Sequence, residues 1–251
     1  MLAIEHLSKR FGTRTAVNDL SLEVRPGELY AFLGPNGAGK TTTLKCVAGL
    51  LWPSAGRVLV GGHDVHAQPV AAKRLLSYVP DQPYLYEKLT GREFLLFVGR
   101  LYGLSRKQCT DTVEELLGLF EAGEWADELA ENYSHGMRQK TVLSAALLHD
   151  PKLLVVDEPM VGLDPASARL VKSVLRQRVE AGCAILMSTH TLSVADEVAD
   201  RVGIIHRGRL IVQGTQEEVR RSTPAMGSLE DVFRDLTEGA ERASAPLPPA
   251  P

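Results

Sequence analysis

Short apolar runs alternate along the chain with stretches of helical pattern, and Gly, Pro and Asp bound most of these runs. This alternation is typical of an α/β sheet. The runs Leu29–Leu33, Leu153–Val156 and Ala184–Met187 are each predicted to form a buried parallel strand that is followed by polar residues. Open α/β sheets bind their ligands beyond the carboxyl ends of such strands, so we expect the functional residues there.

The stretch from about Leu85 to Asp150 has a mostly helical pattern. Thr90–Glu93 fits a capping box that opens one helix, and Gly103 fits the C-terminal stop of that helix. A second amphipathic helix is predicted from apolar residues at positions i, i+3, i+4 and i+7, namely Val113, Leu116, Leu117 and Phe120. We interpret this stretch as a helical subdomain inserted into the α/β core.

The C-terminal part contains a predicted hairpin and a predicted helix. Val202–His206 and Leu210–Gln213 flank Arg207 and Gly208, which favours a tight turn between two strands. Ser228–Asp231 resembles a capping box, and apolar residues follow it on one helical face. The last residues, from 239 to 251, are rich in Ala and Pro and are expected to be disordered.

The pattern therefore divides the chain into several parts. Residues 1–84 and 151–215 form the expected α/β core, and residues 85–150 form the helical subdomain. Residues 216–238 are interpreted as a C-terminal helical extension and residues 239–251 as a tail.

Composition and charge narrow the class of protein. The 251 residues are 44% hydrophobic and 24% charged, as in an average soluble globular protein. The 28 Lys and Arg are outnumbered by 31 Asp and Glu, and a nucleic-acid partner is not expected for a chain of net charge −3. No apolar run reaches the roughly 18 to 20 residues that cross a bilayer, and the N-terminus does not resemble a signal peptide. The three cysteines lie far apart, which favours a reduced intracellular protein without a disulfide framework or a zinc site.

Gly34–Thr41 fits the phosphate-binding pattern G-x-x-x-x-G-K-[ST], between a predicted strand and a predicted helix. The glycines of this loop let backbone N–H groups approach a polyphosphate closely, and the helix N-terminus adds a favourable dipole. Lys40 supplies a positive charge at the β- and γ-phosphates, and the Thr41 hydroxyl can bind Mg²⁺. The sequence therefore predicts a site for a nucleoside polyphosphate and Mg²⁺.

Two acids end the second of the predicted parallel strands. Asp157 suits a Mg²⁺ ion or one of its waters, and Glu158 suits a general base that polarises an attacking water. Acids often end strands for structural reasons, and it is the upstream phosphate loop that favours the catalytic interpretation. His190 follows the third strand, where it could contact a γ-phosphate, and Asp164 fits the N-cap of the next helix.

Taken together, these motifs resemble the ATP-binding subunits of ABC transporters over about residues 2–238. The matching segments are Walker A at Gly34–Thr42, Walker B at Leu153–Glu158, the signature at Tyr133–Met137, where the family has LSGGQ, the D-loop at Gly162–Asp164, the switch histidine at His190 and the adenine-stacking aromatic at Phe11. The resemblance implies Lys40, Glu158 and His190 as catalytic residues. It implies nucleotide contacts from Phe11, Gly34, Pro35, Asn36, Gly37, Ala38, Gly39, Lys40, Thr41, Thr42, Ser134, Gly136 and Asp164.

The resemblance also implies an architecture and a set of partners. The fold is then a P-loop NTPase core of the RecA-like type, with an N-terminal antiparallel β part and the inserted helical subdomain. The chain is then an ATPase that drives a separate transmembrane permease from the cytoplasmic, inner face of the cell membrane. Two ATPase chains, either a homodimer or a pair of related subunits, face each other head to tail. Each ATP is held by Walker A of one chain and by Ser134 and Gly136 of the other, and Asp81–Gly103 is where a cytoplasmic helix of the permease docks.

The segment Tyr84–Thr90 and the signature are most similar to those of bacterial ATPases of ABC-2-type exporters. A second function class stays open, namely a soluble ABC ATPase that acts in DNA repair or translation. Such proteins usually carry two ATPase domains, a zinc insertion or a long coiled coil, and none of these is evident in this sequence. A P-loop regulator or kinase is a third class, and the signature and His190 argue against it.

The signature departs from the family pattern. Ser134 and Gly136 are kept, but Tyr133, His135 and Met137 replace Leu, Gly and Gln. Because the hydroxyl and one glycine survive, we expect a working site, with the bulkier His135 near the phosphate of the partner's nucleotide.

A second departure concerns the glutamine that the family has in its Q-loop. This glutamine aligns with Asp81, which could enter the Mg²⁺ shell together with Thr41 and Asp157. Gln82 takes the role instead if the alignment is shifted by one residue, and the sequence leaves both possibilities open.

Overall fold

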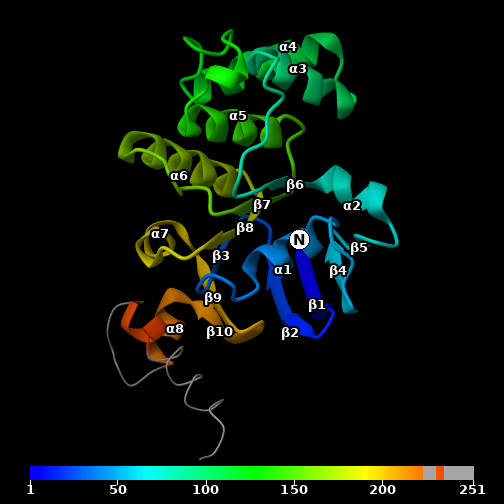
Figure 1. Ribbon diagram of the computed structural model, residues 1–251, viewed down its shortest axis with the longest axis vertical. Coiled ribbons are helices and arrows are strands. Elements are labelled where there is room, and N and C mark those ends of the chain that lie inside the picture. Colours follow the sequence, from blue (N-terminus) through cyan, green and yellow to red (C-terminus); the bar gives the residue numbers. More distant parts are fainter. Residues whose placement is uncertain (223–229, 235–251) are drawn as a thin grey trace, which may run out of the picture.

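A computed structural model describes residues 1–222 and 230–234 of the chain. Its larger sheet has six strands in the order β10-β9-β3-β8-β7-β6 (Figure 1). The strands are β3 (Leu29–Leu33), β6 (Leu76–Val79), β7 (Leu153–Asp157), β8 (Ala184–Thr189), β9 (Arg201–His206) and β10 (Arg209–Thr215). The strands from β9 to β6 run parallel, and β10 pairs antiparallel with β9 at the edge.

The three predicted parallel strands are confirmed as neighbours in this sheet. Every residue of β3, β7 and β8 is buried, as expected where a parallel sheet is covered on both faces. Since β8 lies between β3 and β7, the carboxyl ends of all three strands meet at one edge. The phosphate loop, the two acids and His190 each follow one of these strands, so the topology brings them together.

The smaller sheet is antiparallel, with the order β2-β1-β4-β5, and confirms the predicted N-terminal β part. Its strands are β1 (Leu2–Phe11), β2 (Arg14–Val24), β4 (Ala55–Val60) and β5 (His63–Asp64). Helix α1 (Lys40–Val47) contacts strands of both sheets. Its Leu44 and Val47 lie in the apolar layer between the sheets, together with Leu7 and Phe32.

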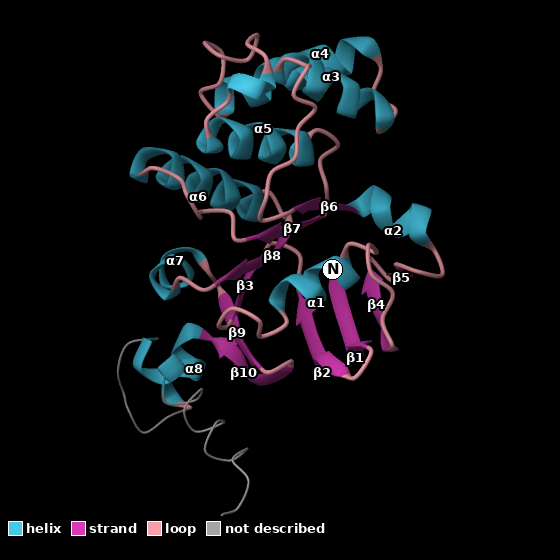
Figure 2. Cartoon of the chain, in the orientation of Figure 1, coloured by secondary structure: helices cyan, strands magenta, loops and turns pink. Residues whose placement is uncertain are grey.

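Three helices follow where the pattern predicted helical structure. They are α3 (Gly91–Leu101), α4 (Arg106–Leu119) and α5 (His135–Leu147), with a short 3₁₀ turn, η1, at Ala130–Asn132. The predicted capping box of Thr90 and Glu93 opens α3, and Gly103 follows it with a φ of 82°. The apolar residues predicted for α4 are buried. Helix α5 lies between the pair α3 and α4 on one side and the large sheet on the other (Figure 2). One continuous hydrophobic cluster joins these helices to β3 and β7.

The remaining helices are α2 (Pro69–Leu75), α6 (Pro165–Glu180), α7 (Leu192–Val198) and α8 (Gln216–Arg221). The predicted hairpin of β9 and β10 is confirmed, and its turn residues Arg207 and Gly208 have φ values of 47° and 79°. Val232 is buried and Phe233 packs against the core. The start of the predicted capping box at Ser228 and the predicted tail at 239–251 lie outside the described residues.

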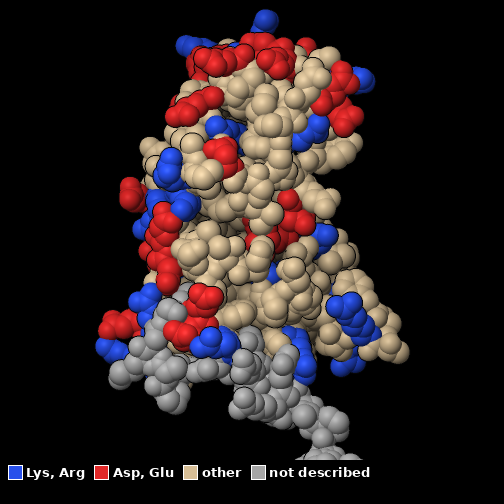
Figure 3. All heavy atoms as spheres, turned by 60° about the vertical axis from the view of Figure 1, so that its left-hand side comes forward, with Lys and Arg blue, Asp and Glu red and all other residues tan. Residues whose placement is uncertain are grey.

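Acidic and basic side chains are interspersed on the face drawn in Figure 3. Arg92 forms ion pairs with Asp127 and Glu114, and Arg176 with Asp200. Exposed pairs of this kind contribute little to stability individually, so burial of the apolar clusters supplies most of the stabilisation of the fold.

In the described part of the chain, no helix combines the length and the apolarity that crossing a bilayer requires.

Candidate nucleotide-binding site

A cavity of about 380 Å³ lies at the edge where the three parallel strands end. It extends from the β1–β2 turn, across the phosphate loop and the start of α1, to the end of β7. Its lining residues are Phe11, Arg14, Ala16, Pro35, Asn36, Gly37, Gly39, Lys40, Thr41, Thr42, Asp81 and Glu158. Most of the predicted nucleotide contacts therefore share one cavity.

The phosphate loop needs its glycines because it passes close to neighbouring backbone. Gly39 has a φ of 113°, and a Cβ there would lie 2.5 Å from the carbonyl oxygen of Ala16. A Cβ at Gly34 would lie 2.5 Å from the carbonyl oxygen of Ile205. A side chain at either position would displace the loop from β2 or β9, so these two strands fix its shape.

Lys40 is held inside the loop, with a side chain that is only 6% exposed. Its Nζ donates a hydrogen bond to the carbonyl oxygen of Gly34 at 2.6 Å and lies 3.6 Å from Oε1 of Glu158. Burial lowers the pKa of Lys40 from its ordinary value, and the negative charges of Glu158 and Asp157 oppose that shift. The positive charge therefore stands at the floor of the cavity with an acid beside it.

Asp157 ends β7 and is fully buried. Its Oδ1 accepts a hydrogen bond from the Ser188 hydroxyl, whereas within the described residues its Oδ2 has no partner in hydrogen-bond geometry. Burial raises the pKa of Asp157, the hydroxyls of Ser188 and Thr41 act in the opposite direction, and the charge of Asp81 adds to the rise. A buried carboxylate oxygen without a partner is costly, and a hard cation such as Mg²⁺ would satisfy it. The residues present therefore fit Mg²⁺.

Glu158 follows β7 directly and has a φ of 49°, in the left-handed region that residues with a Cβ rarely adopt. Its N–H donates to the Ser188 hydroxyl and to the Ser188 carbonyl, each at 3.2 Å. Its Oε1 lies 2.9 Å from the ring atom Nδ1 of His190, and the backbone N–H of His190 donates to Oε2 at 3.3 Å. The residues that follow β7 and β8 thus hold the carboxylate of Glu158 toward Lys40 and the cavity.

Phe11 stands at the other end of the cavity, with 48% of its surface exposed. It pairs with Arg14 across the β1–β2 turn, and the Lys9 ammonium group lies 5.0 Å from the centre of its ring. An exposed aromatic face at this position can stack on a base. Asp81 also lines the cavity, while Gln82 is not among its lining residues.

Several predicted site residues do not line this cavity. Ala38 is buried in the core between the sheets, and Ser134 caps α5, with its hydroxyl accepting from the N–H of Met137 at 3.2 Å. Asp164 caps α6, and its Oδ1 accepts from the N–H groups of Ala166 and Ser167. The remaining four predicted residues outside the lining are Gly34, Gly136, Asp157 and His190.

The signature residues Tyr133 and His135 have contacts that the sequence did not indicate. The Tyr133 hydroxyl accepts from the N–H of Gly91 at 2.9 Å and donates to the carbonyl of Trp125 at 3.0 Å, so it ties together the loops around α3. His135 was expected near the phosphate of a partner's nucleotide. Within the chain, its Nε2 contacts the carbonyl oxygen of Val161 at 2.9 Å. The contact with a partner's phosphate stays a prediction.

Sequence reasoning also missed Arg14 and Ser188. Arg14 lines the cavity because the β1–β2 turn presents it beside Phe11. Ser188 contacts both acids of the site because β7 and β8 pair with Asp157 opposite Ser188. The only sequence signal for Ser188 was its place among the polar residues that end a predicted strand.

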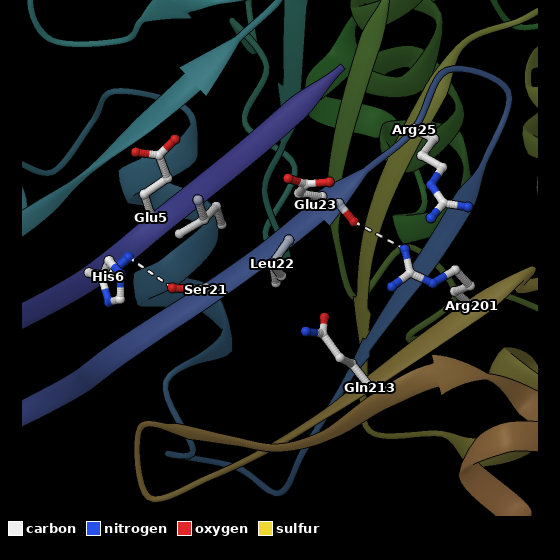
Figure 4. Close-up of a pocket in the computed structure, with 9 residues that line it drawn as sticks. Glu5, His6, Ser21, Leu22, Glu23, Arg25, Arg201 and Gln213 are labelled. Atoms are coloured by element: carbon white, nitrogen blue, oxygen red, sulfur yellow. Dashed lines mark hydrogen bonds between the residues drawn. The ribbon is translucent and has the colours of Figure 1, made fainter.

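A second cavity, of about 430 Å³, lies between the two sheets on the side of β1 and β2 drawn in Figure 4. Arg201 borders it and donates to the carbonyl of Glu23 at 3.4 Å and to Oε1 of Glu28 at 3.2 Å. None of the predicted site residues lines this cavity. The chemistry that the sequence indicates therefore lies outside this second cavity.

Comparison with known proteins identifies the family. The family model described as ABC transporter matches residues 17–161. The linearmycin resistance ATP-binding protein LnrL of Bacillus subtilis is 35% identical, over 87% of this chain and 70% of that protein. The daunorubicin/doxorubicin resistance ATP-binding protein DrrA of Streptomyces peucetius is 42% identical, over 84% of this chain and 64% of that protein, so this match spans just under two thirds of the relative.

Solved structures agree with this assignment. A structure described as the ATP-binding subunit of an ABC transporter has a TM-score of 0.89 and 33% identity, and covers 94% of this chain and 99% of its own. The dimeric, ADP- and phosphate-bound ATP-binding cassette MJ0796 shares the fold, with a TM-score of 0.79 at 21% identity over 86% of this chain and 98% of its own. The phosphate loop, the two acids after β7 and these relatives together show that the chain belongs to the ABC transporter family, as one of its ATP-hydrolysing subunits.

Proposed function

We propose that this chain binds and hydrolyses MgATP as one of two paired ATPase subunits that drive an exporter through a separate transmembrane permease. The observation that carries the proposal is the single cavity that joins an exposed aromatic ring, Phe11, to a buried cation and an acid, Lys40 and Glu158. A nucleoside triphosphate has the matching order of groups, with a base at one end and the γ-phosphate at the other.

The phosphate-binding roles follow from position. The loop residues Pro35, Asn36, Gly37 and Gly39 and the first residues of α1 line the cavity, and Lys40 supplies the charge for the β- and γ-phosphates. The Thr41 hydroxyl, Asp157 and Asp81 would hold Mg²⁺, because Thr41 and Asp81 line the cavity and both act on the Asp157 carboxylate, whose Oδ2 has no partner in hydrogen-bond geometry among the described residues. When bound, Mg²⁺ neutralises phosphate charge and orients the γ-phosphate.

The hydrolytic roles belong to Glu158 and His190. Glu158 accepts a proton from the attacking water as general base, and its strained backbone and hydrogen bonds fix where the carboxylate points. His190 Nδ1 faces Oε1 of Glu158 and so orients it, while the exposed half of the ring is free to contact the γ-phosphate. Asp164 shapes the D-loop by capping α6.

A second chain completes the site. Ser134 and Gly136 lie at the N-terminus of the 13-residue helix α5 and do not line the cavity of their own chain. A helix N-terminus with a hydroxyl is suited to an anion, so we infer that these residues face the γ-phosphate in a partner subunit. The paired chains are either identical or related, and ATP lies between them.

The permease surface is proposed at exposed apolar residues between Asp81 and Gly103. We call these residues the aromatic surface: Tyr84, Tyr86, Phe97, Leu101 and Tyr102. The rings of Tyr84, Tyr86 and Phe97 form one cluster, with Tyr86 5.8 Å from Phe97 and 6.0 Å from Tyr84 between ring centres, whereas the Tyr102 ring stacks on His149. Exposed apolar patches of this kind mark interaction sites, and this one follows Asp81 of the nucleotide cavity directly along the chain. A permease bound there would hold the chain on the cytoplasmic face of the membrane.

Export is supported by the relatives. Two of them are named for antibiotic resistance, and two others are named as a Nod factor export protein of Burkholderia lata and a peptide export protein of Bacillus subtilis. The Burkholderia protein is 40% identical over 83% of this chain, and the Bacillus protein is 37% identical over 84% of it.

The proposal is tested by purifying the tagged full chain from detergent-solubilised membranes of its native cell. We expect a membrane protein with several spans to co-purify, and Tyr86→Glu or Phe97→Glu to release it. Leu50→Glu is the matched control, since Leu50 is an exposed apolar residue outside the aromatic surface. Recovery of the chain with ribosomes or DNA, and without a membrane protein, would favour the soluble class of ABC ATPase.

A further inference from the structure

His135 is the first residue of α5 and stands where the family has a glycine. Its Nε2 lies 2.9 Å from the carbonyl oxygen of Val161. A carbonyl oxygen only accepts hydrogen bonds, so Nε2 carries the hydrogen and donates it. A glycine at this position has no side chain that could make the contact.

The imidazole ring also packs on the residue after Val161. Gly162 has a φ of 72°, and a Cβ there would lie 3.0 Å from Cδ2 and 3.2 Å from Nε2 of His135. Gly136, the next residue of α5, faces Leu163 and Ser167. The first turn of α5 therefore lies on the backbone of the loop between β7 and α6.

This loop begins at the catalytic acid. The N–H of Val161 donates to the carbonyl of Glu158 at 3.2 Å, and the N–H of Leu163 donates to the carbonyl of Met160 at 3.3 Å. The loop is thus a short hydrogen-bonded turn with Glu158, in its left-handed conformation, at one end. An anchor on the carbonyl of Val161 restrains the whole turn, because only two residues separate Val161 from Glu158.

We propose that His135 is a positioning residue, whose hydrogen bond to Val161 and packing on Gly162 hold the turn after Glu158 in the geometry that hydrolysis requires. The inference rests on the proposed role of Glu158 as general base. His135 is also the neighbour of Ser134, so the same contact joins the residue that faces the partner's nucleotide to the acid that acts on the chain's own nucleotide.

The first test compares His135→Ala, His135→Gln and His135→Asn in the full chain. Gln carries an amide N–H at about the reach of Nε2, whereas Asn is one methylene shorter. We expect Ala and Asn to lower kcat by about three- to tenfold, as for one lost hydrogen bond of ordinary strength, and Gln to restore most of the loss. The MgADP dissociation constant should stay unchanged, because His135 does not line the cavity. The control His63→Ala, in a strand remote from the cavity, should match the wild-type chain.

The second test detects the contact between His135 and Val161 without measuring ATP hydrolysis. Hydrogen exchange of a peptide that spans residues 158–164 should be faster in His135→Ala than in the wild-type chain or His63→Ala. Unchanged exchange and unchanged kcat in His135→Ala would overturn the inference, as would a Gln variant as slow as the Ala variant. If the proposed role of Glu158 is wrong, Glu158→Gln hydrolyses ATP at the normal rate, whereas the exchange result for His135→Ala is unaffected. The failure of the proposed function can therefore be told apart from the failure of this inference.

Discussion

The Nζ atom of Lys40 lies 3.6 Å from Oε1 of Glu158, so the cation proposed to bind phosphate forms an ion pair with the acid proposed to act as general base. Both side chains are largely buried, with 6% and 14% of their surfaces exposed. A triphosphate bound at Lys40 would therefore bring its γ-phosphate close to the carboxylate of Glu158.

Replacing Lys40 by Ala should abolish both nucleotide binding and hydrolysis. The lost charge faces the phosphates in the ground state and in the transition state, so both steps depend on it. Binding of a fluorescent ATP analogue measures the effect. Lys45→Ala, on the same helix but outside the cavity lining, is the control. Unchanged ATP affinity in Lys40→Ala would show that Lys40 is not the phosphate ligand.

The dependence of hydrolysis on the Mg²⁺ concentration distinguishes whether Asp81 or Gln82 takes the role of the family's glutamine. Because Asp81 lines the cavity and its charge acts on Asp157, Asp81→Ala should raise the Mg²⁺ concentration for half-maximal ATPase several-fold. Gln82→Ala should change it less. The opposite ranking would assign the family's glutamine position to Gln82.

The buried Asp157 should make the nucleotide-free, Mg²⁺-free protein less stable as pH rises. Burial raises the pKa of Asp157 in the folded chain, so between the ordinary carboxyl pKa and this raised value the folded state binds more protons than the unfolded state. Stability then falls with rising pH across that window. Asp157→Asn cannot ionise, so we expect it to be more stable than the wild-type chain at pH 7.

Urea unfolding at several pH values measures this difference in stability. The advantage of Asp157→Asn should vanish as pH falls below the ordinary carboxyl range, where the wild-type Asp157 is protonated in both states. Asp150→Asn, which changes an exposed acid paired with Lys152, is the control. An Asp157→Asn protein less stable than the wild-type chain at pH 7 would contradict the burial argument.

The sequence predicted the features that depend on local pattern. The capping box at Thr90 and the helical spacing in α4 each reflect constraints within a few residues. The phosphate loop has a fixed local spacing of residue types, although two of its glycines also lie against distant strands. Such constraints are legible in one sequence because helix periodicity and positive φ demand particular residue types.

Contacts between distant residues could not be predicted in the same way. Ser188 meets Asp157 only because β7 and β8 pair in one register, 31 residues apart in the chain. His135 meets Val161 only because α5 packs on the loop after β7. The sequence suggested a role for His135 by resemblance, but its partner in this chain depends on tertiary packing, which no local pattern specifies.

The Glu158→Gln substitution tests both the role of Glu158 as general base and the proposed ATP-dependent dimer. The substitution keeps the shape of the side chain but removes the base and a negative charge beside the phosphates. Nucleotide binding should survive while turnover falls by roughly 10² to 10⁴, the usual worth of a general base. Since ATP is proposed to lie between two chains, an ATP that cannot be hydrolysed should hold them together. Adding Ser134→Arg should prevent the dimer, because it places bulk at the opposing phosphate, yet spare ATP binding to each chain.

Size-exclusion chromatography with light scattering on the Glu158→Gln protein measures directly whether MgATP holds two chains together. We expect a dimer with MgATP, a monomer without nucleotide, and a monomer in both conditions once Ser134→Arg is added. A Glu158→Gln protein that hydrolyses ATP at the wild-type rate, or that stays monomeric with saturating MgATP bound, would contradict the proposed function.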